Sequence, residues 1–350
     1  MIEIKREGVL LTRTDFRFEN EAVLNPAVIR EGNNVHMFYR AVQQGNYSSI
    51  GYCRLEGPLT VVERWAKPIM IPEFDYDSHG IEDARIVKID GLYYMSYTSY
   101  DGVNARGSLA TSKDLLTFEK QGIIVPTMTY AAFVAMVEKA GKVNQDYYLN
   151  HHFYYEPSDP EKKMILWDKN VIFFPRRING KLVFLHRIRP GIQIVSVKHL
   201  TDLTEEFWED YLLNFHDHIV VDPLYAHEAS YIGGGCPPIE TEHGWLLIYH
   251  GVHKTDKGLI YSACAAALLD LNNPIKVIAR LPYPLFKPEL EYELKGDVNN
   301  VVFPTGTALF DDTLYIYYGA ADSVIACASL SFSGLLTELL TNKGEPHKVQ

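Results

Sequence analysis

Cysteine is rare in this sequence, and its spacing is unlike that of metal ligands. The four cysteines, Cys53, Cys236, Cys264 and Cys327, are scattered without a CxxC or CxH pattern. This spacing argues against a zinc site. Cys264 and Cys327 stand in apolar, strand-like stretches, where a buried free thiol is expected more often than a disulfide. We therefore predict free thiols and no metal site.

Positive charge and long apolar runs are also lacking. The chain has 33 Lys and Arg residues against 44 Asp and Glu, a formal net charge of −11, which argues against nucleic acid because that ligand requires a basic face. No apolar run reaches the roughly 20 residues of a membrane span, and the N-terminus has no apolar signal segment. We expect a soluble, cytoplasmic protein, or a periplasmic one if a signal segment has been removed. Oligomer formation stays open.

Aromatic residues, by contrast, are abundant and occur in a recurring pattern. The clearest copy of the pattern runs from Gly80 to Thr98. It places Glu82, Asp83 and Arg85 before alternating β-branched and aromatic residues, with a turn at Asp90-Gly91. This arrangement predicts a charged cluster at the mouth of a β-hairpin.

The same pattern returns four more times, which makes five units. The other copies begin at Asn25-Pro26, Phe174-Pro175, Cys236-Pro237 and Phe303-Pro304, with turns at 32–34, Asn179-Gly180, His243-Gly244 and Asp311-Asp312. Small sheets that repeat in this way must stack on their neighbours to bury their faces. We predict an all-β fold over residues 1–350, a single-domain five-bladed β-propeller in which residues 1–20 lead into or complete a blade. A β-sandwich is the alternative, although sandwiches seldom repeat one pattern five times.

Two segments depart from the repeat and are predicted as excursions, at about 127–163 and 202–230. Tyr130 to Gly141 is rich in alanine and ends in glycine, which favours a helix. The following stretch, 144–163, is rich in His and Tyr and is expected to lie over one face of the propeller. Asp202 to Leu213 and Ser331 to Leu340 are predicted as two further short helices.

Polar residues occupy matching positions of the five units, where the inner strands of a propeller converge on a central channel. These residues are Asn25, Arg40, Asp83, Arg85, Asp101, Arg187, His250 and Asp322. A channel lined by arginines, carboxylates and a histidine suits a sugar-active enzyme, which needs fixed hydrogen bonds, one acid and a group that delivers the nucleophile. A single Asp beside an Arg is more often a structural ion pair, but the five-fold coincidence favours a functional site.

Several motifs of the sequence resemble those of glycoside hydrolase family 130. They include Gly80-Ile-Glu-Asp-Ala-Arg85, Ile232-Gly-Gly-Gly-Cys-Pro-Pro-Ile, Leu247-Ile-Tyr-His-Gly251 and Tyr318-Gly-Ala-Ala-Asp322. The resemblance spans about residues 20–325, in order and in all five repeats. It implies a five-bladed propeller with the activity of an inverting β-mannoside phosphorylase or β-1,2-mannosidase.

The resemblance also implies roles for individual residues. Asp83 matches the proton donor to the glycosidic oxygen, which in some members acts through a sugar hydroxyl. Asn25, Arg40 and Asp322 match residues that hold the mannosyl unit. The other substrate-binding residues that we predict are Arg85, Asp101 and Tyr231.

One departure from the family pattern bears on the reaction type. Three basic positions that bind phosphate in the phosphorylases are matched here by Lys169, Arg187 and His250. The fourth position is a lysine in the family pattern and Tyr231 in this sequence. Losing that charge weakens phosphate binding by about 1.5–3 kcal/mol. A hydrolase instead needs a carboxylate base, at roughly 6.5–9.5 Å from the acid if the reaction inverts. Glu228 is the candidate base, with a structural carboxylate paired with Arg187 or Lys169 as the alternative.

The leading hypothesis from sequence is therefore an inverting exo-β-mannosidase acting on β-1,2-linked mannose in oligosaccharides, with Asp83 as acid and Glu228 as base. The first alternative is a β-mannoside phosphorylase that releases mannose 1-phosphate. The second is a non-catalytic carbohydrate-binding propeller. Neither chemistry requires a metal or a cofactor, and inorganic phosphate enters only as the co-substrate of a phosphorylase.

Overall fold

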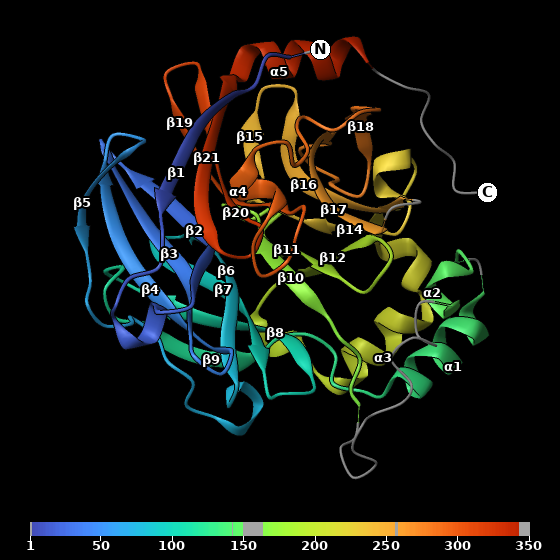
Figure 1. Ribbon diagram of the computed structural model, residues 1–350. Helices are drawn as coiled ribbons and strands as arrows, with labels where there is room; N and C mark the ends of the chain where they lie inside the picture. The colour runs from blue at the N-terminus through green and yellow to red at the C-terminus, as the bar shows by residue number, and fades with distance from the viewer. Residues whose placement is uncertain (1, 142, 150–163, 256–257, 343–350) are drawn as a thin grey trace.

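Residues 2–141, 143–149, 164–255 and 258–342 are described by the computed structural model, which is mostly β with few helices (Figure 1). The His- and Tyr-rich excursion predicted at 144–163 lies outside these residues beyond position 149. The described strands form four sheets, and the eight-stranded sheet contains two antiparallel units, so that five units correspond to the five predicted repeats.

The strands of the five units are as follows. Unit 1 contains β2 (Ala22–Glu31), β3 (Asn34–Gln43), β4 (Tyr47–Glu56) and β5 (Thr60–Arg64). Unit 2 contains β6 (Gly80–Ile89), β7 (Leu92–Tyr100), β8 (Ala105–Ser112) and β9 (Glu119–Ile123). Unit 3 contains β10 (Lys169–Phe173), β11 (Leu182–Arg187), β12 (Ile192–Val197) and β13 (Ile219–Val221). Unit 4 contains β14 (Tyr231–Gly234), β15 (Ile239–Thr241), β16 (Gly244–Thr255), β17 (Gly258–Leu269) and β18 (Val277–Arg280), and unit 5 contains β19 (Val302–Phe310), β20 (Thr313–Ala320) and β21 (Val324–Ser331).

The first and last described strands pair in unit 5. Strand β1 (Lys5–Leu11) pairs antiparallel with β21, so the start of the chain supplies the fourth strand of the last unit. This pairing confirms the prediction that residues 1–20 complete a sheet. Figure 1 shows the blue N-terminal strand lying along the red C-terminal strands. Units 1 and 2 are also linked, by one parallel bridge between Ser48 and Gly80.

Five hydrophobic clusters lie between consecutive units. One cluster joins units 1 and 2, the next joins units 2 and 3, and the following two join units 3 and 4 and units 4 and 5. The fifth contains Tyr39 of unit 1 and Tyr317 of unit 5, so the last unit packs on the first. Each unit therefore buries its faces against its two neighbours, as expected for small sheets that cannot do so alone.

The turns between the first two strands of the units follow the sequence signals. Asp90 and Asn179 adopt left-handed φ angles of 50°, and glycine follows each of them. This geometry suits the tight hairpins that Asp-Gly and Asn-Gly favour. The turns of units 1 and 5 also lie where predicted, whereas that of unit 4 spans 242–243, one residue earlier than expected.

The described helices are short and lie outside the sheets. They are α1 (Tyr130–Ala140), α2 (Asp146–Leu149), α3 (Glu205–Leu213), α4 (Glu291–Leu294) and α5 (Phe332–Thr341). The three helices predicted from sequence are thus confirmed as α1, α3 and α5. The predicted excursion at 202–230 also contains β13, the outer strand of unit 3, which was not expected. None of these helices is both long and apolar enough to cross a membrane.

Candidate active site

Irregular positions in the first strands of units 1 and 2 project two predicted site residues toward each other. Asn25 in β2 and Asp83 in β6 both have a φ of 49°, and the pairing register shifts at each of them. Such bulges re-aim side chains that strict alternation would send to opposite faces. As a result, the consecutive residues Glu82 and Asp83 both face Arg40, whose guanidinium nitrogens lie 2.8 Å and 3.9 Å from their carboxylates.

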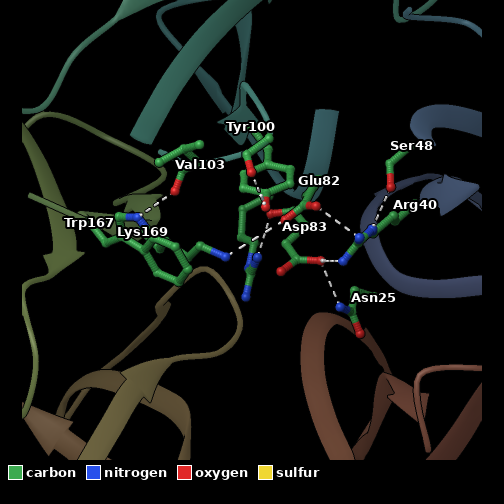
Figure 2. Close-up of polar contacts among 11 residues, drawn as sticks. Asn25, Arg40, Ser48, Glu82, Asp83, Tyr100, Val103, Trp167 and Lys169 are labelled. Carbon is green, nitrogen blue, oxygen red and sulfur yellow. Dashed lines mark hydrogen bonds and ion pairs between the residues drawn. The ribbon is translucent and has the colours of Figure 1, made fainter. Parts of the chain in front are cut away.

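Asp83 and its neighbours form a polar cluster that joins three units (Figure 2). Asn25 Nδ2 donates a hydrogen bond of 2.7 Å to Asp83 Oδ1. Glu82 uses one oxygen to bind Arg40, and its other oxygen lies 3.7 Å from Lys169 Nζ of unit 3. Glu82 therefore bridges cations from two sides of Asp83. The sequence placed Glu82 in the charged cluster with Asp83 and Arg85, but no specific contact was predicted for it.

Unit 5 reaches the same cluster through two residues near the end of β20. A Cβ at Gly319 would lie 2.0 Å from Asn25 Oδ1, so only glycine leaves room for the Asn25 side chain. Asp322 follows the strand with a left-handed φ of 49°. It is close enough to Asp83 and Arg40 for their charges to affect its ionisation.

The two aspartates of the cluster have opposite pKa shifts. Burial favours the neutral form of both side chains. At Asp83, the positive charges of Arg40, Arg85 and Lys169 outweigh burial and lower the pKa. At Asp322, burial and the negative charge of Asp83 raise the pKa to about 6 in spite of Arg40. Asp83 is therefore a carboxylate in the free site, while Asp322 takes up a proton near pH 6.

The predicted phosphate-binding positions come together on the side of units 3 and 4. Lys169 in β10 and Arg187 in β11 are register partners, as are Gly233 and His250 in unit 4. The two pairs are adjacent, because a Cβ at Gly233 would lie 2.5 Å from Asn170 Nδ2 of unit 3. The sequence prediction that these positions converge is consistent with this geometry.

Tyr231 lies beside this group and contacts two arginines. The guanidinium carbon of Arg187 is 5.3 Å from the centre of the Tyr231 ring, and that of Arg189 is 3.9 Å from it. Arg189 was not predicted as a site residue. Its spacing of two from Arg187 was the available signal, since residues i and i+2 of an extended chain share a face.

His250 contributes no positive charge to the group. Its side chain is 1% exposed. Burial lowers the pKa of His250 well below its usual value, and the charges of Arg187, Arg85 and Arg189 lower the pKa further. The imidazole is therefore neutral and offers one N–H donor and one acceptor.

Comparison with known proteins gives the family. A family profile described as beta-1,4-mannooligosaccharide phosphorylase matches residues 4–339. The chain belongs to glycoside hydrolase family 130. A protein of Thermoanaerobacter sp. (strain X514) named 1,2-beta-oligomannan phosphorylase is 35% identical over 350 residues, which cover 96% of this chain and 99% of the relative.

Other relatives extend this result. The Beta-1,2-mannobiose phosphorylase of the same organism is 34% identical over 344 residues, which cover 94% of this chain and 96% of that one. The solved structure of the Listeria innocua Beta-1,2-mannobiose phosphorylase, in complex with β-1,2-mannobiose, has a TM-score of 0.71. It is 23% identical, and the match covers 97% of this chain and 100% of that chain, so it shows that the fold is shared.

In this family 130 protein, two residues that we predicted to bind mannose form hydrogen bonds mainly with backbone groups and neighbouring side chains. Arg85 is 1% exposed and donates from Nε to Gly235 O at 2.9 Å, from Nη2 to Gly234 O and from Nη1 to the Asp83 carbonyl. Burial lowers the pKa of Arg85. These contacts tie unit 2 to unit 4, so the described bonds of Arg85 are structural, and its contact with mannose stays a prediction.

Asp101 likewise organises a loop. Its Oδ1 accepts hydrogen bonds of 2.9 Å and 2.7 Å from the backbone N–H groups of Val103 and Asn104. Its Oδ2 accepts a hydrogen bond from Asn104 Nδ2 at 3.1 Å and lies 3.5 Å from Arg106. These bonds explain the position of Asp101 without a sugar, in contrast to the predicted mannose contact.

Glu228, the candidate base, is a fully buried carboxylate surrounded by donors. It ends a single 3₁₀ turn, Ala226–Glu228, and its Oε2 accepts from the backbone N–H groups of Leu224 and Tyr225 at 2.9 Å and 3.0 Å. The same oxygen lies 2.6 Å from Arg280 Nη2. Its Oε1 accepts from the Tyr249 hydroxyl at 2.6 Å.

This environment argues against the prediction that Glu228 activates water. Burial alone would raise the pKa of Glu228, but His227, Arg280 and Tyr249 lower the pKa to about 2. The side chain is 0% exposed, and both oxygens are occupied. The structural alternative that we considered fits better, with Arg280 as the partner instead of Arg187 or Lys169.

A cavity of about 1020 Å³ opens beside Arg40 and Asp322. Its lining mixes polar and apolar residues, and the polar ones include Glu21, Gln44 and Asp297. Its volume lies at the upper end of the range for small-ligand pockets, and its polar side chains can bind ring hydroxyls. Among the described residues, no group of three or more His, Cys, Asp or Glu is arranged to hold a metal.

Proposed function

We propose that this protein is a β-mannoside phosphorylase that cleaves β-1,2-linked mannooligosaccharides with inorganic phosphate and releases mannose 1-phosphate. We further propose that the five units are the blades of one propeller domain spanning residues 1–350, with the reaction at its centre. The sequential packing of the units and the contact of unit 5 with unit 1 support this architecture. So do the polar contacts that join residues of several units at Asp83.

In this reaction, phosphate attacks the anomeric carbon on the face opposite the leaving sugar. The bond from C1 to the glycosidic oxygen breaks, a bond from C1 to a phosphate oxygen forms, and Asp83 delivers a proton to the leaving oxygen. Inversion converts the β-mannoside into α-mannose 1-phosphate. Asn25, Arg40 and Asp322 hold the mannosyl unit, and Lys169, Arg187 and His250 bind the phosphate.

The ionisation of Asp83 fits an acid that works only in the loaded site. The neighbouring cations lower its pKa, so it is a carboxylate before the substrates bind. A bound phosphate brings negative charge toward Lys169, which is one of the groups that hold the Asp83 pKa down. Partial neutralisation of these cations raises the Asp83 pKa and prepares it to carry a proton.

The bonds that Glu228 already accepts are the observation that most favours phosphate over water as the nucleophile. Our preference for hydrolysis required Glu228 as a base, yet its oxygens already accept bonds from Tyr249, Arg280 and two backbone N–H groups. The names of the two Thermoanaerobacter relatives favour the same choice and the β-1,2 linkage. Phosphorolysis is therefore better supported than the hydrolysis that we put first from sequence.

The direct test is to incubate the purified protein with β-1,2-mannobiose and β-1,2-mannotriose, with and without inorganic phosphate. We expect mannose 1-phosphate to form in the phosphate arm and cleavage to be negligible in the phosphate-free arm. β-1,4-Mannobiose serves as the linkage control and should react more slowly. Release of mannose at equal rates in both arms would identify a hydrolase, and sugar binding without turnover in either arm would identify a binding protein.

A further inference from the structure

Two arginines separated by one residue face the same aromatic ring. Arg187 ends β11, and Arg189 follows in the connection to β12. Their guanidinium carbons lie 5.3 Å and 3.9 Å from the centre of the Tyr231 ring. Arg187 is buried and Arg189 is half-buried, so both charges lie in a partly desolvated region where electrostatic interactions are strong.

The proposed phosphate positions supply less positive charge than their residue types suggest. Burial keeps His250 neutral. Lys169 lies 3.7 Å from a carboxylate oxygen of Glu82. A phosphate near neutral pH carries between one and two negative charges, and its oxygens are strong acceptors that favour planar guanidinium donors. A further cation close to Arg187 would meet this need.

Arg189 is close enough to act on this region. Its positive charge, like that of Arg187, lowers the pKa of His250 in unit 4. The Tyr231 ring stands at the position where the resemblance to the family implies a lysine. Arg189 therefore brings a positive charge to the place where Tyr231 removes one.

Tyr231 also provides a way to hold two like charges near each other. The faces of an aromatic ring are electronegative, and a guanidinium over such a face gains about 0.5–2 kcal/mol. Arg187 and Arg189 both gain from the same ring, which offsets part of their mutual repulsion. A lysine at position 231 would instead repel both.

From this geometry, we propose that Arg189 is a phosphate-binding residue, positioned by stacking on Tyr231, and that the Arg189 and Tyr231 pair replaces the lysine of other phosphorylases in the family. The proposal rests on the phosphorylase function above. It assigns Arg189 to the binding of phosphate rather than mannose, so its loss should affect the two substrates differently.

The test compares the R189M variant with the wild type in steady-state phosphorolysis of β-1,2-mannotriose. We expect the KM for phosphate to rise about ten- to 100-fold, as for loss of a charged hydrogen bond. The KM for the mannoside, measured at saturating phosphate, should change less than about two-fold. R177M is the matched control, because Arg177 pairs with Asp90 on the surface at 2.7 Å, and its phosphate KM should equal that of the wild type.

A double variant tests the replacement directly. Adding Y231K to R189M returns a cation to the site, and the phosphate KM should fall back at least about five-fold relative to R189M. A merely structural role for Arg189 would lower the midpoint of thermal unfolding and would not be rescued by Y231K. If R189M leaves the phosphate KM unchanged, or raises both KM values equally, the proposal is wrong.

A binding measurement separates this proposal from the proposed function. Isothermal titration with inorganic phosphate alone, on the wild type and on R189M, requires no turnover. If the wild type hydrolyses mannosides without phosphate but still binds phosphate through Arg189, the phosphorylase function fails while the site stands. If the wild type is a phosphorylase and R189M binds phosphate equally well, the function stands and the role of Arg189 is overturned.

Discussion

Asp83 and Glu228 differ in how many hydrogen bonds and ion pairs their carboxylates form within the protein. Asp83 is partly buried and Glu228 is fully buried, each next to an arginine, and both were candidates for catalysis from the sequence. Glu228 accepts from backbone N–H groups, a tyrosine and Arg280, and its pKa falls to about 2. Asp83 projects from a bulge toward Arg40, and Arg40 and Asp322 line a cavity that Asp83 itself does not line. A buried acid beside an arginine is therefore not sufficient evidence of catalysis.

The Glu228 arrangement also recurs elsewhere in the molecule. Glu19 accepts a 2.7 Å hydrogen bond from the Tyr39 hydroxyl in unit 1 and lies 3.0 Å from an Arg64 nitrogen. In unit 5, Glu293 accepts a 2.7 Å bond from the Tyr318 hydroxyl and lies 2.9 Å from Arg6 Nε. In units 1, 4 and 5, an acid in the segment before the first strand thus binds a tyrosine and an arginine. These contacts hold that segment against its sheet. Asp83 lies within the first strand of its unit instead of before it, so it does not belong to this repeated set.

The largest effect that distinguishes the two acids is expected on turnover in D83N. Asparagine keeps the oxygen that accepts from Asn25 but cannot deliver a proton. We expect kcat to fall about 10²- to 10⁴-fold, the usual contribution of a general acid. The midpoint of thermal unfolding should stay near that of the wild type. Stopped assays of mannose 1-phosphate and differential scanning fluorimetry measure the two quantities.

A mannoside whose leaving group needs no proton provides the control for this variant. The activated substrate 4-nitrophenyl β-mannoside should react with D83N far better, relative to the wild type, than mannotriose does. Equal losses on both substrates would argue that Asp83 positions the sugar instead of protonating the leaving oxygen.

The reverse pattern is expected for E228Q. Removing the charge of Glu228 leaves Arg280 buried without its counter-ion, and breaking such a pair costs about 3–5 kcal/mol. The variant should unfold at a clearly lower urea concentration, while kcat per folded molecule stays within about two-fold of the wild type. Because Glu228 has a depressed pKa, its contribution to stability is present above its unfolded pKa of about 4.5 and is lost toward pH 2.

E293Q is the matched variant for this comparison, since Glu293 has the same kind of tyrosine and arginine partners. It should lose stability to a similar extent and also retain turnover. A large fall in kcat for E228Q but not for E293Q would restore Glu228 as a catalytic residue.

Much of the fold was readable from the sequence because the relevant signals are local. The Asp90-Gly91 and Asn179-Gly180 turns fix hairpins through their own backbone preferences. The helix at Tyr130 begins at a capping residue, Thr129, and ends at Gly141 with a left-handed φ of 65°. Strand β13 was missed because a three-residue strand has too little sequence to show alternation.

The site was only partly readable, because its members depend on contacts between distant segments. Asp83 and Asn25 were identified from their motifs, and they are hydrogen-bonded partners. The sequence did not reveal that donors of Arg85 bond to the carbonyls of Gly234 and Gly235, and its sugar contact stays a prediction. The role of Glu228 was readable in principle, had the recurrence of Glu19 and Glu293 before the other units been compared.

The smallest and most specific effect is expected for D322N, and it depends on pH. The pKa of Asp322 is raised from 3.8 to about 6 by burial and by neighbouring carboxylates, so the folded protein binds this proton more tightly than the unfolded chain does. Asp322 therefore makes stability fall as pH rises from about 4 to 6, and the ionised form remains unfavourable above that range. D322N removes the effect and should be more stable than the wild type by about 3 kcal/mol at pH 8, with little difference at pH 4. Its mannoside KM should rise, because Asp322 is proposed to hold the sugar, so the gain in stability accompanies a loss of binding. Thermal unfolding from pH 4 to 8 measures the difference, and a gap that is constant with pH, or widest at pH 4, would contradict the proposed charge repulsion between Asp322 and Asp83.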